Sequence, residues 1–589
     1  MLLAACAGSA PLNPDKPSDP ASVNLTTVMD LHHDAVLNSH AGDELYSVLQ
    51  PMYNWFDVMP HEKLTAGVPA SATEQQQAIY PRIKKMSDGR YIMFYHGGRF
   101  GTRIWYITSD DFRKWTEPVM LFGPVNVEII NAEGKKVKDV IRYVNPDAAV
   151  LPNGDLLMVC SYRAAGNYSD GINGGLSFMR STDNAKTWGE RMDVPVGTNW
   201  EPYLLVLPDR IQCYYTDATP MTRNSGTSVI ESFDGGKTWS EKKRVCRQYK
   251  YDYFTRDPEK TKYNGEKIYT DQMPCFRLLN DGKTLVGWLE ARLESPAPDD
   301  CSLDEYKSFC SMSLVYNDGF DWEDLGEESE GPKRRLTNVM SKGAAGYIST
   351  FPSGEVVLSC GKDQLFHLRI GDATATRFYG NSRWTDDGNW LIPFEEIGYW
   401  GCTEVITPNI LAIAMHSEDS GMQTGLLYLN QRIDAGRQAV TVDGDCEEWP
   451  ADQAFFIGSR KGDEVLVRAA SDEESLYLAV DRLAANLSKN SNVTLIVAKD
   501  GTKDAINVKI GQGGIVSSSN KQVTAACRKA SSASGAKGFV GEVAIPLSAL
   551  GAGQGDTVRL YAILEEGLSK TTFSFSNASK PDTWQKIKL

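Results

Sequence analysis

The chain has 589 residues and a formal charge of −15 at pH 7, from 61 basic and 76 acidic side chains. This length exceeds what a single hydrophobic core usually supports, so we expect at least two domains. An acidic surface repels phosphate backbones, which argues against nucleic acid as a partner. The 13 Trp and 25 Tyr residues exceed what a core needs, and flat rings in excess suit either sugar binding or a β-rich protein.

The first residues resemble the end of a bacterial lipoprotein signal. The run Leu3-Ala4-Ala5-Cys6 matches the motif in which the cysteine is lipidated after cleavage. We therefore expect lipidation at Cys6, an upstream basic and apolar segment, and residence in the bacterial cell envelope with membrane contact only through the lipid. Residues 1–23 would be a signal remnant and a Pro/Ser/Asp-rich tether. The alternative is a chance match.

Six copies of one strand–turn–strand pattern follow. The first reads YPRIKKMSDGRYIMFYH and the second NPDAAVLPNGDLLMVCSY. The turn residues, spaced by about 64 residues, are Gly89, Gly154, Arg210, Gly282, Gly354 and Ile410. This period fits a four-stranded blade with its loops, so the repeats predict an all-β fold with a six-bladed β-propeller over residues 24–436.

A second repeated motif agrees with a propeller. Residues 232–239 read SFDGGKTW, a complete Asp-box, and residues 181–188 depart from it only at Ala185. Residues 108–115 and 315–322 are degenerate copies. The Asp is expected to cap the backbone N–H groups of a turn and the Trp to pack between blades, so the boxes are structural. They indicate a sialidase-like propeller.

The repeat pattern stops near residue 437. The segments VTVDGDCEEWP, DEESLYLAVD and GFVGEVAIPLSAL alternate as strands without an Asp-box, which predicts a β-sandwich over residues 437–589. This stretch resembles carbohydrate-binding modules of family 9, in which these motif residues are framework. Two roles stay open for it, sugar binding through Trp449 or Trp584 and a spacer.

The first strand of each blade lines the central channel, so its side chains are candidates for a site. Nine residues before the turn stand Tyr80, Asn145, Glu201, Met273, Ala345 and Gly401. Seven residues before it stand Arg82, Asp147, Tyr203, Cys275, Tyr347 and Thr403. A mixture of acid, base, amide and phenol where a structural core would be apolar predicts a substrate pocket at the mouth of the channel.

Two carboxylates are expected to meet at this mouth. Glu201 begins the inner strand of the third blade, and Glu290 ends the second strand of the fourth. A first strand begins and an antiparallel second strand ends on the same rim. Paired carboxylates are what glycoside hydrolysis requires. Glu404 and Asp271 are alternative partners on the inner strands or their approaches.

The segments IYPR, NWEPYLLVLPD, DQMPCFRLLNDG…GWLE and GYISTFPSGEVVLS resemble glycoside hydrolase family 93, over residues 79–417. The resemblance implies a retaining exo-α-1,5-L-arabinanase with Glu201 as the acid/base and Glu290 as the nucleophile. The chain departs from the family pattern just before Met273-Pro274, where it has Asp271-Gln272 and the family usually has Glu or Gly. We expect a monomer that acts on an oligosaccharide or polysaccharide and needs neither metal nor cofactor. The proposed sugar contacts are Arg82, Asn145, Trp200, Asp271 and Tyr347.

Three other functions stay open. An exo-α-sialidase needs an arginine triad to clamp the substrate carboxylate. Arg82 stands where the first of these arginines would be, although the order here is Y-P-R-I and not the F-R-I-P of sialidases. Three further residues, none in a recognisable motif, could complete the triad: Arg163, Arg256 and Arg292. A propeller polysaccharide lyase would use His96 and Tyr95 to remove a proton alpha to a uronate. A non-catalytic glycan-binding protein would tolerate the loss of either carboxylate.

Overall fold

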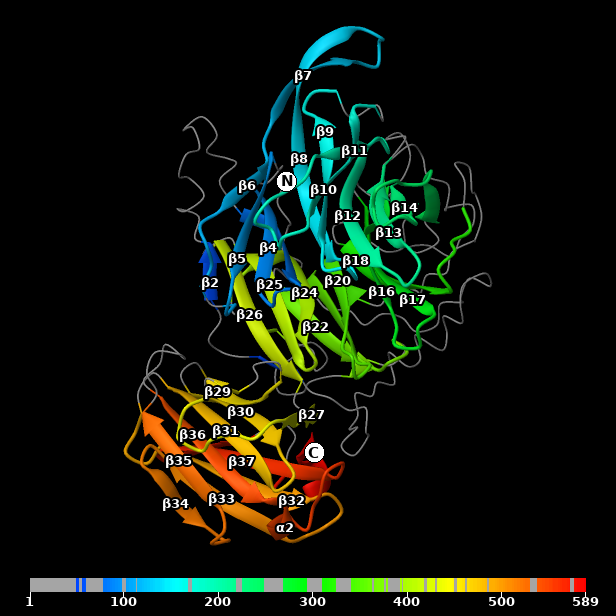
Figure 1. The fold of residues 1–589 in the computed structure, drawn as a ribbon. Coiled ribbons are helices and arrows are strands. Elements are labelled where there is room, and N and C mark those ends of the chain that lie inside the picture. Colours follow the sequence, from blue (N-terminus) through cyan, green and yellow to red (C-terminus); the bar gives the residue numbers. More distant parts are fainter. Residues whose placement is uncertain are drawn as a thin grey trace.

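A computed structural model of the chain consists almost entirely of β-strands (Figure 1), which confirms the predicted all-β class. It describes residues 49–51, 56–59, 78–97, 102–112, 114–167, 172–218, 225–247, 268–293, 310–324, 341–362, 365–375, 378–379, 392–394, 396–417, 421–429, 432–446, 448–449, 453–460, 463–484, 487–529, 538–572 and 577–589. The predicted lipid site at Cys6 and the tether lie outside these residues, as does Arg256. No helix in these ranges is long and apolar enough to cross a membrane.

The first three antiparallel sheets follow one another along the chain. The first contains β3 (Ala78–Lys85), β4 (Tyr91–Gly97), β5 (Arg103–Ser109) and β6 (Val119–Phe122). The second contains β7 (Val125–Ile130), β8 (Lys136–Val150), β9 (Leu156–Ala164), β10 (Gly174–Ser181) and β11 (Met192–Val194). The third contains β12 (Asn199–Val206), β13 (Ile211–Asp217), β14 (Gly226–Ser232) and β15 (Lys243–Arg247).

Three further sheets continue the series. The fourth contains β16 (Ile268–Leu278), β17 (Thr284–Leu293), β18 (Cys310–Asp318) and β19 (Ser341–Lys342). The fifth contains β20 (Ala344–Thr350), β21 (Val356–Lys362), β22 (Leu365–Gly371) and β23 (Phe378–Tyr379). The sixth contains β24 (Gly398–Thr407), β25 (Ile410–Ser417) and β26 (Gly421–Leu429). Its outer edge is completed by the N-terminal strands β1 (Leu49–Pro51) and β2 (Phe56–Met59), which both pair with β26.

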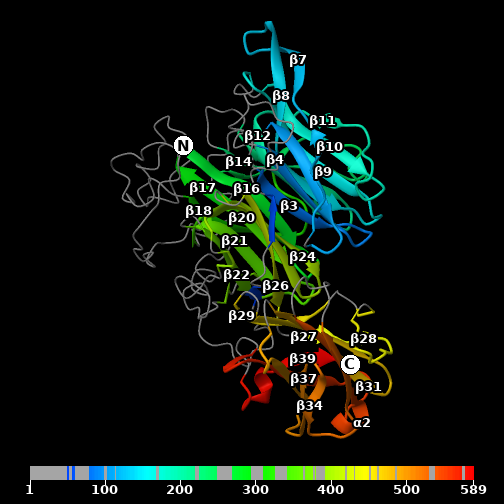
Figure 2. The ribbon, with the colours of Figure 1, turned by 90° about the vertical axis from the view of Figure 1, so that its left-hand side faces the viewer.

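The innermost strands of these sheets form a closed ring. Each contacts the next around the circle, in the order β3, β8, β12, β16, β20, β24 and back to β3. Sheets that radiate from a common axis in this way make a β-propeller. The hairpin of β7 and the start of β8 projects beyond the other sheets, at the end farthest from the C-terminal lobe (Figures 1 and 2).

The Asp-boxes perform the expected structural role. Asp234 accepts hydrogen bonds from the backbone N–H groups of Lys237 and Thr238 at 3.0 and 2.9 Å. Trp239 stacks on Phe178 of the second sheet, with ring centroids 4.5 Å apart. The turn of the box is therefore closed by its own carboxylate, and its indole packs on the preceding sheet.

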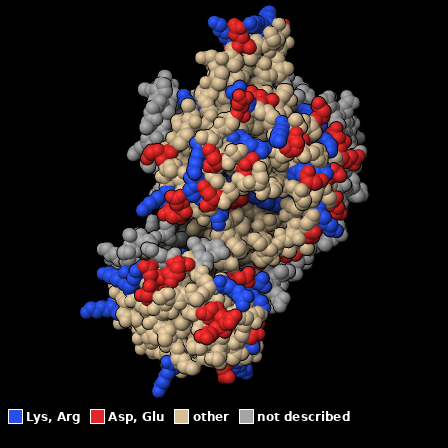
Figure 3. All heavy atoms as spheres, viewed as in Figure 1, with Lys and Arg blue, Asp and Glu red and all other residues tan. Residues whose placement is uncertain are grey.

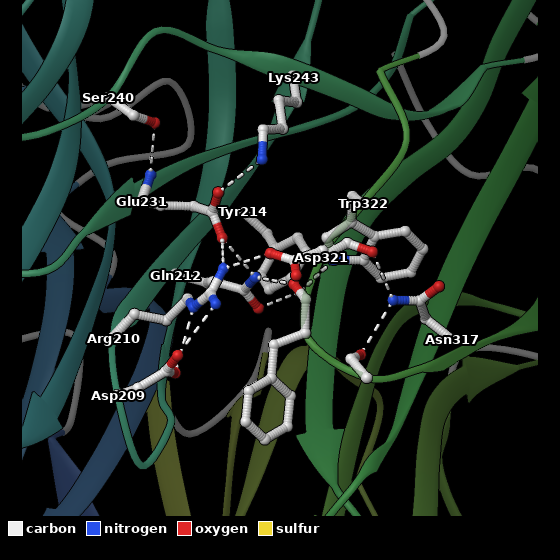
Figure 4. A network of polar contacts seen from close by, with 12 residues as sticks. Asp209, Arg210, Gln212, Tyr214, Glu231, Ser240, Lys243, Asn317, Asp321 and Trp322 are labelled. Carbon is white, nitrogen blue, oxygen red and sulfur yellow. Dashed lines mark hydrogen bonds and ion pairs between the residues drawn. The ribbon is translucent and has the colours of Figure 1, made fainter.

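One polar network joins the third and fourth sheets (Figure 4). Arg210 occupies the turn position where most copies have glycine, and its guanidinium contacts Glu231 at 3.0 Å and Asp321 of the degenerate fourth box at 2.7 Å. Gln212 also donates to Glu231, at 2.9 Å. The departure from glycine at this turn thus provides a cross-sheet connection.

The C-terminal residues form two sheets. One contains β27 (Arg432–Asp434), β39 (Gln585–Lys588), β37 (Thr557–Glu566), β32 (Asn492–Lys499), β33 (Ala505–Gly511), β34 (Gly514–Ser518) and β38 (Ser569–Thr572). The other contains β28 (Gly436–Arg437), β29 (Phe455–Arg460), β30 (Asp463–Ser471), β31 (Ser475–Ala484), β36 (Phe539–Pro546) and β35 (Thr524–Lys529), followed by the short helix α2 (Leu547–Leu550). Both contribute to one apolar core, and β27 already pairs with β39 at residue 432, five residues before the predicted boundary.

The two tryptophans considered for sugar binding in this lobe are buried. Trp449 is 5% exposed and donates to Glu542 at 2.6 Å, while Trp584 is 6% exposed and packs on Tyr561. Neither indole offers a free face to a sugar, which favours the spacer role. On the face seen in Figure 3, acidic and basic side chains are interspersed over both lobes, and this face carries no single large patch of one charge.

Candidate active site

All six inner strands carry a two-residue bulge at the same level. The strand register breaks at each of these pairs: Tyr80-Pro81, Asn145-Pro146, Glu201-Pro202, Met273-Pro274, Ala345-Gly346 and Trp400-Gly401. The first residue of each pair has a left-handed φ, between 47° and 65°. Such a backbone costs of order 1–3 kcal/mol at a non-glycine residue and is typical of functional sites.

The second residue of each pair suits the bulge. Proline needs no ladder partner, because it has no N–H group. Glycine gives room, since a Cβ at Gly346 would lie 2.3 Å from Met312 and from Trp288, and one at Gly401 would lie 2.3 Å from Phe366. The sequence pattern of any residue followed by Pro or Gly therefore marks the bulge in every copy.

The sixth copy corrects the sequence alignment. Counting back nine and seven residues from the turn gives Gly401 and Thr403 as the members of the sixth copy that face the axis. In the structure the matching residues, the first of the bulge and the one that follows the bulge, are Trp400 and Cys402. A further register irregularity between Val405 and Thr407 adds one residue between bulge and turn. Trp400 was missed for this reason, although alignment on the X-Pro/X-Gly pair would have found it.

The bulge residues surround the axis at the mouth of the channel. Tyr80, Met273 and Ala345 form one buried cluster, and Trp400 packs against it. Asn145 and Glu201 occupy the two remaining positions of the ring. The mouth thus has an apolar, aromatic sector and a polar sector, which is the division that a sugar ring with one apolar face needs.

Glu201 is the carboxylate of the polar sector. Its Oε2 accepts a hydrogen bond of 2.6 Å from the hydroxyl of Thr216 on β13. The pKa of Glu201 is raised to about 7: burial raises it most and the negative charge of Glu290 adds to this, while the hydrogen bond from Thr216 and the positive charges of Arg163 and Arg82 lower it. A carboxyl with a pKa near neutrality can act as a general acid and then as a general base.

Glu290 meets Glu201 at this rim in a different environment. It is 4% exposed, and its Oε1 accepts a hydrogen bond of 2.9 Å from the side-chain amide of Gln272. Its Oε2 accepts one of 2.7 Å from the backbone N–H of Ala345. Two N–H donors stabilise the charged form of a carboxylate and fix its orientation, which suits a nucleophile.

Residues 271–273 connect the two carboxylates. Strand β16 has a second bulge before Gln272, so both neighbours of this residue have a left-handed φ, 52° at Asp271 and 50° at Met273. Between the two bulges only Gln272 keeps a register partner, which is Glu290. The carbonyl of Asp271 accepts a hydrogen bond of 2.5 Å from Thr227. Asp271, a predicted sugar contact, is 2% exposed beside the nucleophile candidate rather than open to the mouth.

Arg82 and Tyr347, also predicted as sugar contacts, lie one level deeper in the channel. The Arg82 guanidinium stacks on the Tyr80 ring, 3.6 Å from its centre, and lies 5.0 Å from the centre of the Tyr347 ring. It donates to the carbonyls of Pro81 at 2.6 Å and Trp400 at 3.4 Å and is 4% exposed. Arg82 is therefore buried against the Tyr80 ring, and its Nη1 is used by two backbone carbonyls.

Glu404, the alternative catalytic partner, lies deeper still. It forms ion pairs with Lys84 at 2.9 Å and with Arg277 at 3.2 Å. This carboxylate pairs with cations from two other inner strands, which explains its presence without a catalytic role.

The remaining predicted contacts, Asn145 and Trp200, lie on neighbouring strands near the polar sector. The backbone N–H of Asn145 donates to His96 Nδ1 at 3.0 Å, and Arg163 lies 5.9 Å from the Trp200 ring. Burial, with the positive charges of Arg163 and Arg82, lowers the pKa of His96 to about 3, so its ring is neutral. A base this weak, next to a Tyr95 that points into the core on the opposite face of β4, does not support the lyase alternative.

In the described ranges no group of three or more His, Cys, Asp or Glu side chains is arranged to hold a metal ion.

No protein-family model matches the chain, and no curated protein matches it. Solved structures do show similarity. A protein of unknown function from Dyadobacter fermentans DSM 18053 is 14% identical, with a TM-score of 0.40 over 60% of this chain and 95% of that chain.

Two sialidases are also similar. The Hadza microbial sialidase Hz136 is 12% identical, with a TM-score of 0.38 over 61% of this chain and 67% of its own. The Trypanosoma rangeli sialidase in complex with the inhibitor DANA is 11% identical, with a TM-score of 0.37 over 84% of each chain. At these scores the likeness says nothing of this chain's activity.

Proposed function

We propose that the protein is a retaining glycosidase in which Glu201 is the acid/base and Glu290 the nucleophile. The observation that carries the proposal is the contrast between two carboxylates at one rim. Glu201 is held by one hydroxyl in a setting that raises its pKa to about 7, whereas Glu290 accepts two N–H hydrogen bonds. A carboxyl that can hold a proton near neutrality suits the acid, and a carboxylate oriented by two N–H donors suits the nucleophile.

The reaction then proceeds in two steps. Glu290 attacks the anomeric carbon while Glu201 gives its proton to the glycosidic oxygen, so the C–O bond breaks and a glycosyl ester forms on Glu290. In the second step Glu201, now ionised, takes a proton from water as the water oxygen attacks the same carbon. This attack releases the sugar, restores the Glu290 carboxylate and leaves Glu201 protonated.

For the substrate we propose plant α-1,5-arabinan, cleaved from chain ends, on a six-bladed propeller followed by a β-sandwich with a spacer role. Support comes from the family 93-like segments that contain both carboxylates and from the uncharged sector formed by Tyr80, Met273 and Trp400. A sialidase would need an accessible arginine in the first sheet, and Arg82 is buried and stacked on the Tyr80 ring. The lipid anchor at Cys6 and a cell-envelope location belong to the same proposal.

The test is product analysis with linear arabinan, sialyllactose and a uronate polymer. We expect short arabino-oligosaccharides from arabinan and no reaction with the other two. Release of sialic acid or of an unsaturated uronate would overturn the proposed substrate. No hydrolysis of any glycoside would overturn the proposed function.

The roles of the carboxylates are tested separately. E201A and E290A should each lower kcat at least about 1,000-fold, and azide should restore turnover by E201A on an aryl glycoside, because this small nucleophile needs no general base. E241Q, a change at an exposed glutamate two residues after the third Asp-box, is the control and should match the wild type. Wild-type rates in E201A or E290A would reject the assignment.

A further inference from the structure

Thr216 lies at the junction between the third and fourth sheets. It is fully buried on β13, and its hydroxyl oxygen accepts the backbone N–H of Met273 at 2.9 Å. The same oxygen lies 2.6 Å from Oε2 of Glu201. A threonine hydroxyl has one proton to donate. Because Met273 supplies the proton of the first contact, the hydroxyl proton is directed at Glu201.

The neighbouring strand provides a parallel contact. Thr227 on β14 is the register partner of Thr216, is equally buried, and donates to the carbonyl of Asp271. The two threonines therefore hold residues 271–273 at both ends. Gln272, between them, donates to Glu290. Of the two threonines, Thr216 is the one that contacts a proposed catalytic carboxylate, Glu201. It also binds the backbone of Met273, the residue next to Gln272, which in turn donates to Glu290.

We propose that Thr216 is a positioning residue that orients the Glu201 carboxylate, favours its ionised form and holds it in register with Glu290 through the backbone of Met273. This inference rests on the proposed role of Glu201. A hydrogen bond to a charged acceptor is about twice as strong as one to a neutral acceptor. The hydroxyl therefore stabilises the carboxylate more than the carboxylic acid.

Other charged groups also face Glu201. Glu290 on β17 disfavours its ionisation, and Arg163 on β9 and Arg82 on β3 favour it. The Tyr80 phenol, also on β3, is neutral, since burial and the negative charges of Glu201 and Asp147 raise its pKa. None of these groups changes when Thr216 is replaced, so its contribution can be isolated.

The direct test is the titration of the Glu201 carboxyl in the full chain by carbon-13 NMR of glutamate-labelled protein, with E201Q to assign the signal. T216V, which keeps the volume but removes the hydroxyl, should raise the midpoint from about 7 by about one pH unit. T216S should restore it. T227V removes an equally buried hydroxyl from the partner strand and should leave the midpoint unchanged.

Activity gives a second readout. In T216V the alkaline limb of kcat/KM should move to higher pH by the same amount, and kcat should fall at least about tenfold from lost orientation. If T216V does not fold, T216A is the second hydroxyl-free variant, with the same expected shift. An unchanged midpoint in folded T216V or T216A, or an equal shift in T227V, overturns the inference. If no glycoside is hydrolysed, the proposed function fails, while the titration still decides the role of Thr216.

Discussion

The side-chain amide of Gln272 lies 2.9 Å from Oε1 of Glu290, within a strand segment bulged on both sides of it. The segment Asp271-Gln272 is where the sequence departs from the family 93 pattern. The departure therefore falls on a residue that contacts the proposed nucleophile. Gln272 is the one residue of the segment that keeps a register partner, and this partner is Glu290.

The first prediction follows from this contact. Q272L should lower kcat about 10- to 100-fold, because hydrogen bonds to charged groups contribute roughly 1.5–3 kcal/mol and the nucleophile loses one of its two donors. Q212L is a matched control, since Gln212 donates to the buried Glu231 over the same 2.9 Å in the network of Figure 4. It should lower the unfolding temperature without lowering kcat. An equal loss of kcat in both variants would contradict the prediction.

The second prediction concerns pH and stability. The pKa of Glu201 is raised to about 7 in the folded chain from an ordinary value of 4.5, so the folded state binds the proton more tightly than the unfolded state. The contribution of this carboxyl to stability is fully present below about pH 4.5 and is lost as pH rises to 7, by up to about 3 kcal/mol. E201Q, which stays neutral, should escape this loss.

The measurement is the unfolding temperature of the wild type and E201Q at pH 4.5 and pH 8. We expect E201Q to unfold a few degrees higher than the wild type at pH 8, with a smaller difference at pH 4.5. E241Q alters an exposed carboxyl and should show no such pH-dependent gain. A gain for E201Q that is the same at both pH values would show that ionisation of Glu201 is not its cause.

Much of this site could be predicted from sequence. The turn residues have local signatures, as does the proline or glycine that ends each bulge, so the common rim of Glu201 and Glu290 could be predicted from strand direction. The depth of Arg82 could not be predicted. Alternation places Tyr80 and Arg82 on the same side of the strand, and only the bulge and the packing of the Tyr80 ring at 3.6 Å decide which of the two reaches the mouth.

Trp400 shows a different kind of limit. Counting back from the turn misplaces it by one residue, because the strand has an irregularity between Val405 and Thr407, whereas the Trp400-Gly401 pair marks the bulge correctly. The hydrogen bond from Met273 to Thr216 joins two neighbouring sheets, and the one from Gln272 to Glu290 joins two strands of the fourth sheet at a bulge. Such contacts arise from tertiary structure, so a repeat analysis finds the strands but not the partners.

The last prediction tests the cross-sheet network at Arg210. Replacing it with glycine, the residue at this turn in four other copies, should destabilise the propeller by about 1–3 kcal/mol, because the buried carboxylate of Glu231 loses a charged partner. The Glu201 titration should not change, since Arg210 is not among the charged groups that act on that carboxyl. D209N is the control: Asp209 is 53% exposed, and an exposed ion pair contributes about 0–1 kcal/mol. Denaturant unfolding of both variants measures the difference, and an R210G variant as stable as D209N would show that the network of Figure 4 does not hold the two sheets together.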